Sequence, residues 1–360
     1  MNKFKKIGLT ALATSLVASS AYAAEVSVSG GAGVTWSTQS GTSGSALDHG
    51  KGIGTDNSIA FASSGELDNG WSVSAAVALA TTTALSSSSV TMTMGSMGSL
   101  AWGMGMAGNA GNYDGLAGAY DEVDDGGAVS LSTNLIGSTV DNGGIFYTSP
   151  SVDAGGASVK LHLGYTPRVT NADITGGGTS GATAKGSGQN AGVTISSDAG
   201  LTAGVYVNQV ATNDAAGEDT FQGTWYATYA MGPVSFGYQQ SYVDNGVSGA
   251  AQVAAATKTF AAGTGVFEAD QWSLIMNVND NLSVSYAEAD DTYDAQKGWT
   301  TATTTGDSIA DVTMSMKSIQ AAYSMGSMSV KAYRTETDNA GYVTSGGSNT
   351  VNEIALGLSF

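Results

Sequence analysis

Apolar and polar residues alternate with a period of two along most of this chain. Large residues on one face of two such segments are Trp71, Val73, Val77 and Leu79, and Trp272, Leu274, Met276 and Val278. The opposite faces carry mainly serine, threonine, asparagine, glutamine, glycine and alanine. A period of two is typical of β-strands with one apolar and one polar face, whereas helical periodicity is nearly absent.

The alternating segments predict sixteen strands whose connections alternate in length. We place the strands at residues 25–37, 56–64, 70–80, 86–95, 98–106, 143–149, 156–166, 189–197, 200–210, 221–231, 233–243, 267–279, 281–290, 314–325, 328–336 and 350–360. Tight turns at 95–98, 197–200, 231–233, 279–281 and 325–327 alternate with longer polar segments at 38–55, 107–142, 167–188, 244–266, 291–313 and 337–349. We therefore predict an all-β fold, a sixteen-stranded antiparallel transmembrane β-barrel, because closure satisfies every backbone polar group in lipid.

The composition fits a protein whose surface faces lipid. Charged residues make up only 12% of the chain, about half of the share typical of soluble globular domains, while 42% of the residues are hydrophobic. The formal net charge of −18 disfavours a nucleic acid as a partner. There is no cysteine, so no disulfide contributes to stability.

The N-terminus has the layout of a secretory signal peptide. Lys3, Lys5 and Lys6 precede the apolar run 7–18, and small residues flank the expected cleavage site at Ala23. We therefore expect residues 1–23 to be a signal peptide and residues 24–360 to form a single exported barrel domain.

Three segments resemble a known family. The stretches SIAFASSGELDNGWSVSAAVAL, GGIFYTSPS and the final ALGLSF are similar to the trimeric general porins of Gram-negative outer membranes, particularly the alphaproteobacterial type. The resemblance implies a homotrimer in outer-membrane lipid and lipopolysaccharide, a channel for small hydrophilic solutes, and a long third loop folded into the pore. It also implies recognition by the barrel-assembly machinery.

The final strand is a candidate assembly element. Ile354, Leu356, Leu358 and Phe360 alternate with small residues, so we expect them to face lipid while the last strand pairs with the first. A terminal aromatic residue is similar to the signal that the assembly machinery reads on bacterial outer-membrane proteins. Phe360 is therefore the predicted assembly signal.

The longest polar segment, 107–142, matches the position of the constriction loop of the family. Its acidic residues, our candidate pore-lining groups, are Asp114, Asp121, Glu122, Asp124 and Asp125. The sequence departs from the family in its cations, because Lys51 is the one lysine and there is no arginine between Glu25 and Val159, where porins carry an arginine cluster. We expect Lys160 and Lys331 on polar strand faces to oppose the acids, and the net negative lumen to prefer cations.

Acidic segments at 120–125 and 288–294 also raise calcium as a possible ligand. Neither has the EF-hand spacing, yet oxygen-rich loops bind divalent cations. Asp121, Asp124 and Asp125 are the candidate metal ligands, and we expect no other cofactor.

Catalytic chemistry is poorly supported. His49 and His162 are the two histidines, and they are not spaced as a metal pair. The glycine-rich segment 175–190 lacks the phosphate-loop spacing and precedes a strand rather than a helix. We therefore do not expect an enzyme.

The sequence leaves other classes of protein open beside an outer-membrane porin. A secreted surface-layer or adhesin-type protein shares the acidic, cysteine-free, glycine-rich composition. A barrel enzyme would need catalytic geometry in the lumen, and a substrate-specific porin cannot be separated from a general one by sequence.

Overall fold

The chain folds into one closed sheet. The structure, a computed structural model, describes residues 25–43, 46–80, 83–104, 116–123, 144–167, 185–212, 219–246, 265–294, 311–342 and 347–360. Residues 1–23 lie outside this part, so the signal peptide stays a prediction. In the described residues no helix is long and apolar enough to cross a membrane.

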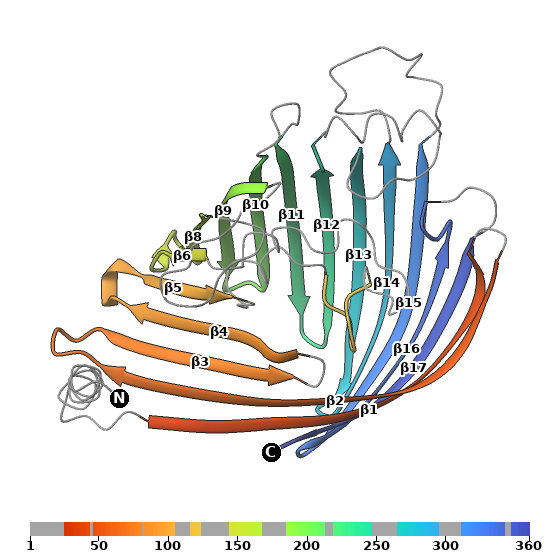
Figure 1. The fold of residues 1–360 in the computed structure, drawn as a ribbon, viewed down its shortest axis with the longest axis horizontal. Helices are drawn as coiled ribbons and strands as arrows, with labels where there is room; N and C mark the ends of the chain where they lie inside the picture. Colours follow the sequence, from red (N-terminus) through yellow and green to blue (C-terminus); the bar gives the residue numbers. More distant parts are fainter. Residues whose placement is uncertain are drawn as a thin grey trace, which may run out of the picture.

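The strands run in chain order around the sheet (Figure 1). They are β1 (Glu25–Ser43), β2 (Ala46–Glu66), β3 (Ser72–Ala80), β4 (Thr83–Thr93), β5 (Ser99–Met104), β6 (Gly144–Thr148), β7 (Val152–Asp153), β8 (Ala157–Thr166), β9 (Lys185–Ser197), β10 (Leu201–Thr212), β11 (Thr220–Met231), β12 (Val234–Asp244), β13 (Val266–Asn279), β14 (Leu282–Asp294), β15 (Val312–Met325), β16 (Met328–Asp338) and β17 (Ser348–Ser359). A short 3₁₀ turn, η1 (Gly95–Met97), joins β4 to β5.

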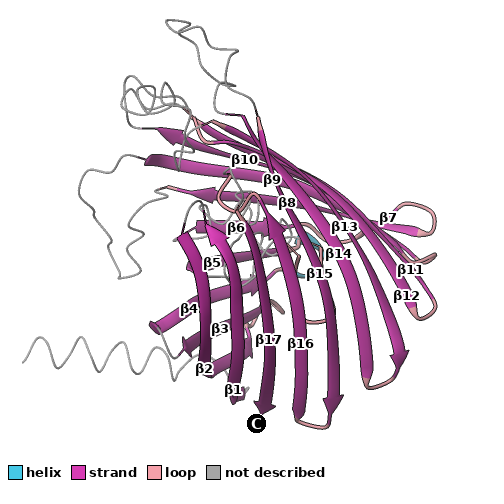
Figure 2. Cartoon of the chain, turned by 90° about the vertical axis from the view of Figure 1, so that its right-hand side faces the viewer, coloured by secondary structure: helices cyan, strands magenta, loops and turns pink. Residues whose placement is uncertain are grey.

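The pairing closes a sixteen-stranded antiparallel barrel. β6 and β7 both pair with β8, so together they occupy one of the sixteen positions. Consecutive strands pair antiparallel, and β17 pairs with β1 from Gly31 opposite Ser359 to Gly41 opposite Asn349. The predicted fold class and all sixteen predicted strands are confirmed. Viewed from the side, the described chain is almost entirely strand (Figure 2).

Short turns connect the strands at one end because their residues fit tight backbone geometry. The Asn279 side chain accepts backbone hydrogen bonds from Asn281 and Leu282 at 2.9 and 3.0 Å. Gly232 and Gly326 have φ of 59° and 61°, a region that favours glycine. The predicted tight turns at these places are confirmed.

The register separates an outer face from an inner face. We call outer the face that carries exposed apolar residues such as Val34, Phe61, Trp225 and Leu274. The register places Val28 opposite Phe61 and Trp36 opposite Ile53 on this face. Alternate residues, mostly small or polar, point to the inner face, as the period of two requires.

Some predicted polar connections are shorter in the structure than the sequence indicated. Residues 38–43 and 46–55 continue β1 and β2, whose pairing runs to Ser43 opposite Ala46, instead of forming a long loop. Residues 291–294 likewise continue β14. These stretches contain few large apolar residues, so the apolar alternation was too sparse to indicate strands that have regular ladder pairing.

The inner face is packed on one side and open on the other. Inner-face residues of β10 to β15 are buried, among them Tyr206, Gln239, Gln271 and Met314. Inner-face residues of β2 and β3, among them Asp56, Ser58 and Ser74, are exposed. The free part of the lumen therefore lies beside β1 to β3.

Candidate functional site

Residues 116–123, which we call the inner segment, lie against the inner face of the barrel. The backbone N–H of Ala119 donates to Ser285 Oγ on β14 at 2.8 Å. The N–H groups of Tyr120 and Asp121 both donate to Gln320 Oε1 on β15, at 2.8 and 3.0 Å. This part of the predicted 107–142 loop therefore lies inside the barrel against β14 and β15, and the remainder of the predicted loop lies outside the described residues.

Gln320 is itself held in place by a chain of buried polar groups. Its Nε2 donates to Ser318 Oγ at 3.1 Å, and Ser318 lies 2.9 Å from Thr335 Oγ1 on β16. Ser318 and Gln320 are two residues apart on one strand, so their side chains share the inner face. With its nitrogen bonded to Ser318, the Gln320 oxygen is oriented toward the inner segment.

Tyr120 joins the inner segment to two charged residues of the wall. Its hydroxyl donates to Glu353 Oε1 on β17 at 2.5 Å. Lys331 Nζ on β16 lies 5.2 Å from the centroid of its ring, and the Tyr333 ring lies at 5.2 Å. Burial, with the Glu353 hydrogen bond and charge, raises the pKa of Tyr120 far above its ordinary value. The hydroxyl therefore stays protonated and continues to donate.

The two ends of the inner segment are apolar anchors. Leu116 is buried, and its side chain occupies the space that a side chain at Gly237 on β12 would need. Val123 is 1% exposed and packs into a cluster that includes Met314 and Met316 of β15. The inner segment is thus fixed by apolar contacts at its ends and by hydrogen bonds at its centre.

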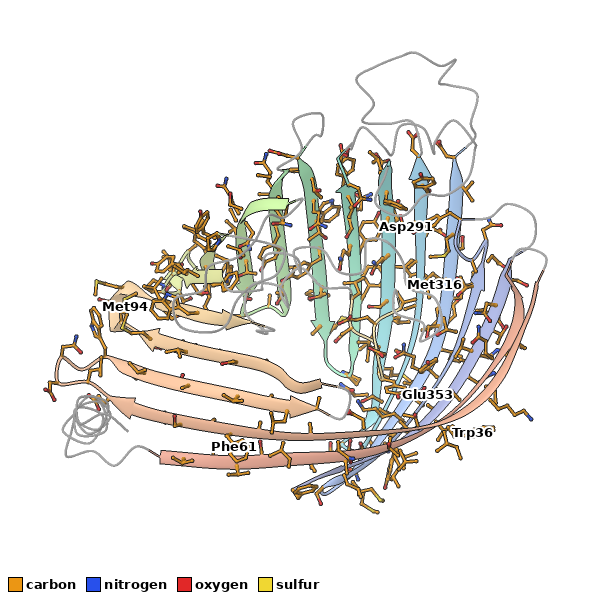
Figure 3. The ribbon with its side chains drawn as sticks, in the orientation of Figure 1. Trp36, Phe61, Met94, Asp291, Met316 and Glu353 are labelled. Atoms are coloured by element: carbon orange, nitrogen blue, oxygen red, sulfur yellow. The ribbon has the colours of Figure 1, made fainter. Side chains whose placement is uncertain are left out.

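A second inward contact lies at the end of the barrel opposite to the short turns. Tyr342, in the connection between β16 and β17, donates through its hydroxyl to Asp291 Oδ2 at 2.7 Å. Its ring packs on Phe267 and Tyr293, with centroids 5.2 and 5.7 Å away. Asp291 is fully buried, and it lies on the packed side of the lumen (Figure 3).

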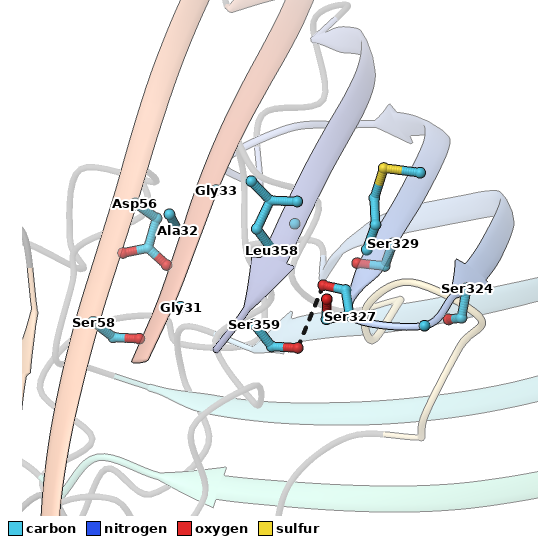
Figure 4. A pocket seen from close by; sticks show the side chains of 13 residues that line it. Gly31, Ala32, Gly33, Asp56, Ser58, Ser324, Ser327, Ser329, Leu358 and Ser359 are labelled. Atoms are coloured by element: carbon cyan, nitrogen blue, oxygen red, sulfur yellow. Dashed lines mark hydrogen bonds between the residues drawn. The ribbon is translucent and has the colours of Figure 1, made fainter. Parts of the chain in front are cut away.

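Two hollows line the open side of the lumen near the seam between β1 and β17. One, of about 400 Å³, is lined by small and polar residues, including Gly31, Asp56, Ser58, Ser329 and Gly357 (Figure 4). The other, of about 250 Å³, is lined by residues that include Ser37, Tyr333 and Glu353. Figure 3 shows Glu353 on the inner side of this seam and Trp36 on the outer side.

The structure describes some of the predicted pore residues, and others lie outside the described part of the chain. Asp121 and Glu122 belong to the inner segment, whereas Asp114, Asp124 and Asp125 lie outside the described residues. Lys160 on β8 and Lys331 on β16 point to the inner face, because each pairs with inner-face neighbours: Thr194 and Ala355. A constriction role for these residues stays a prediction. Lys331 contacts the inner segment.

The structure describes only one of the three predicted metal ligands, Asp121. The described residues contain no group of three histidine or acidic side chains that could hold an ion. Two of the three candidate ligands, Asp124 and Asp125, lie outside these residues. In the other acidic segment, Glu288 and Asp290 lie on the outer face while Asp291 is buried on the inner face, so strand alternation separates them.

His162 is a buried inner-face residue with hydroxyl neighbours. Its Nε2 lies 3.0 Å from Thr194 Oγ1, and its Nδ1 lies 3.4 Å from Thr148 Oγ1. The side chain of the other histidine, His49, lies outside the described part.

Tyr120, Gln320 and Glu353 are members of the site that were not predicted from the sequence. Glu353 has the same strand parity as Ala355 and Gly357, so the alternation indicated an inward carboxylate. No signal in the sequence paired it with Tyr120, because that contact depends on the path of the loop.

No protein-family model and no curated protein matches this chain. Solved structures match its fold. OmpF of Salmonella typhi, in a complex with daunomycin, has a TM-score of 0.65 at 13% identity and covers 93% of this chain and 97% of its own. An anion-selective porin from Comamonas acidovorans has a TM-score of 0.61 at 14% identity, covering 94% and 100%. A structure described as a porin has a TM-score of 0.59 at 17% identity, covering 93% and 100%.

Proposed function

We propose that this chain is an outer-membrane porin, a water-filled channel for passive diffusion of small hydrophilic solutes and ions. One observation carries the proposal: a closed barrel has an apolar outer face, a largely polar inner face and an inner segment hydrogen-bonded to that inner face. A sixteen-stranded barrel encloses an aqueous lumen rather than a packed interior. The fold likeness to OmpF and other porins supports this function over catalysis.

The outer face supports a location in a membrane. Exposed apolar residues cover the outer face near the short turns, and aromatic rings form a second row farther along the strands. Tyr229, Phe236 and Tyr323 belong to the first row, and Trp225, Trp272 and Tyr286 to the second. Two rows of aromatic residues are typical of the interfaces on either side of a membrane-spanning barrel.

We further propose that the channel prefers cations. Asp121 and Glu122 of the inner segment and Glu353 of the wall outnumber Lys331 near the narrowed lumen. Acidic groups lining a pore favour cations. One structural neighbour is named as anion-selective, so the fold leaves the sign of selectivity to the charges of each chain.

The remaining parts of the proposal rest on the family resemblance. We propose that residues 1–23 direct export, that the barrel-assembly machinery inserts the chain beside lipopolysaccharide, and that three copies associate. A neighbour described as the trimer form of OmpT of Vibrio cholerae supports the last point, with a TM-score of 0.59. We also propose Asp121, Asp124 and Asp125 as ligands of a calcium ion.

Planar-bilayer recordings of detergent-purified protein test the proposal. We expect stepwise conductance that grows linearly with salt, and reversal potentials on the cation side in a salt gradient. An absence of conductance from folded, membrane-inserted protein would reject the porin function. Extraction from cells without detergent would favour a surface-layer protein, and conductance blocked saturably by one solute would favour a substrate-specific porin.

A further inference from the structure

Glu353 lies on the open side of the lumen. On β17 it pairs with Ser37 of β1 and Tyr333 of β16, and its side chain lines the hollow of about 250 Å³. The wall on one side of β17, from β10 to β15, is filled by buried side chains. An ion that passes the inner segment is therefore directed toward the wall that carries Glu353.

The charge of Glu353 has one cationic neighbour across Tyr120. The Tyr120 hydroxyl donates to the carboxylate of Glu353, while Lys331 Nζ lies 5.2 Å from the centroid of the same ring. Two inner-face charges of opposite sign thus meet at one aromatic side chain. Without the carboxylate, the ammonium of Lys331 would face the passage with one fewer acid beside it to offset its charge.

The carboxylate is also held at a fixed depth. Tyr120 is tied to the wall through its own backbone N–H on Gln320, so its hydroxyl presents a fixed donor to Glu353. A charge fixed beside a narrow passage acts on each passing ion, because the screening length at physiological salt is about 8 Å. A mobile charge would spend part of its time beyond that distance.

We propose that Glu353 is a specificity-determining residue of this channel, offsetting Lys331 so that the passage beside the inner segment remains net negative. The inference rests on the proposed porin function and adds a residue of the wall to the loop acids as a source of selectivity. It also predicts that Lys331 acts in the opposite sense, lowering the preference for cations that Glu353 raises.

The test compares two tyrosine–carboxylate pairs on opposite faces of the barrel. In the outer-face pair, the Tyr286 hydroxyl donates to Glu288 Oε1 at 2.5 Å, the same distance as in the inner pair. The variants are Glu353→Gln, Tyr120→Phe, Lys331→Gln and the control Glu288→Gln. Each is recorded in planar bilayers in a gradient of potassium chloride at low salt.

We expect Glu353→Gln to lower the cation-to-anion permeability ratio by about twofold or more, from the Coulomb energy of unit charges roughly 8 Å apart in water. Lys331→Gln should raise the ratio, and Glu288→Gln should leave it unchanged. Tyr120→Phe keeps the charge of Glu353, so the ratio should stay nearer to that of the unmutated channel while current noise increases. If Tyr120→Phe lowers the ratio as much as Glu353→Gln does, Glu353 acts only by placing the segment, and the inference is overturned.

A cysteine variant keeps the test decisive if Glu353→Gln does not assemble. The chain contains no cysteine, so Glu353→Cys gives one thiol that can be modified after assembly. A thiol reagent carrying a sulfonate should raise cation preference, and one carrying an ammonium should lower it. Equal effects of the two reagents, in a channel that conducts, would overturn the inference and leave the porin function standing. A folded protein that never conducts would overturn both.

Discussion

Gly30 and Phe360 exchange two backbone hydrogen bonds across the seam of the barrel. Gly30 N donates to Phe360 O at 2.8 Å, and Phe360 N donates to Gly30 O at 3.0 Å. The ring of Phe360 covers Gly30 so closely that an added Cβ would lie 2.6 Å from Cε2. The final residue is therefore joined to the first strand by its backbone and by its side chain.

Removing Phe360 should lower the amount of protein assembled in the outer membrane. The deletion eliminates both backbone hydrogen bonds and the ring at the seam, whereas Gly30→Val keeps the bonds and displaces the ring. We expect the deletion to have the larger effect and Gly30→Val to destabilise the barrel by roughly 1–3 kcal/mol through overpacking. The measurement is the yield of heat-modifiable protein in outer-membrane fractions.

The matched control for the seam is Gly33→Ala. An added Cβ at Gly33 meets its nearest atom at 3.7 Å, an ordinary contact, and it points to the lumen instead of the outer face. Its yield should equal that of the unmutated chain. Normal assembly of the Phe360 deletion would show that the terminal residue has no part in insertion.

Tyr342→Phe should destabilise the packed side of the lumen. The substitution removes the hydroxyl donor from Asp291, a fully buried carboxylate, and a buried acceptor that loses its partner costs about 1–3 kcal/mol. The control is Tyr238→Phe, because Tyr238 donates to the exposed Asp270, which also accepts from Gln240 at 2.6 Å. At one fixed heating rate in detergent, the apparent melting temperature should fall clearly for Tyr342→Phe and little for Tyr238→Phe. Equal shifts would contradict the buried role of the Tyr342 hydroxyl.

Gln320→Leu should loosen the inner segment without changing the charge of the lumen. The leucine cannot accept the N–H groups of Tyr120 and Asp121, while Gln320→Glu retains a carbonyl-type acceptor at the same length. We expect increased open-channel current noise for Gln320→Leu and nearly normal noise for Gln320→Glu. Identical recordings from both variants and the unmutated channel would show that the apolar ends, Leu116 and Val123, are sufficient to hold the segment.

The sequence predicted the barrel because its strands repeat one simple pattern. Every second residue of a spanning strand faces lipid and is apolar, so segments such as β13 were placed within a few residues of their true bounds. The alternation of apolar and polar residues is lost where a strand continues beyond its lipid-facing part. The continuation of β1 carries serine, threonine, glutamine and glycine, and the continuation of β2 is rich in glycine, so their sequences lack a regular apolar alternation although the two strands pair along their whole length.

The candidate site was less predictable than the fold. Strand parity was sufficient to place Lys160 and Lys331 on the inner face, since parity is a local property. The contacts of Tyr120 with Gln320 and Glu353 join residues about 200 or more positions apart, and they depend on how one loop crosses the lumen. Asp291 shows the same limit, because its burial follows from Tyr342 of a different connection.

The acids of the inner segment should contribute to cation preference in a salt-dependent manner. We expect the double variant Asp121→Asn with Glu122→Gln to move the reversal potential in a salt gradient toward the nonselective value. The outer-face variants Asp290→Asn and Glu336→Gln should change it much less, because these carboxylates lie on the other side of the barrel wall. Screening decides the salt range of the measurement, since the screening length falls from about 8 Å at physiological salt to about 3 Å at 1 M. The difference between inner and outer variants should therefore be large at low salt and small at high salt. If both sets of variants behave alike at low salt, or if the unmutated channel prefers anions, the inner segment does not set the selectivity.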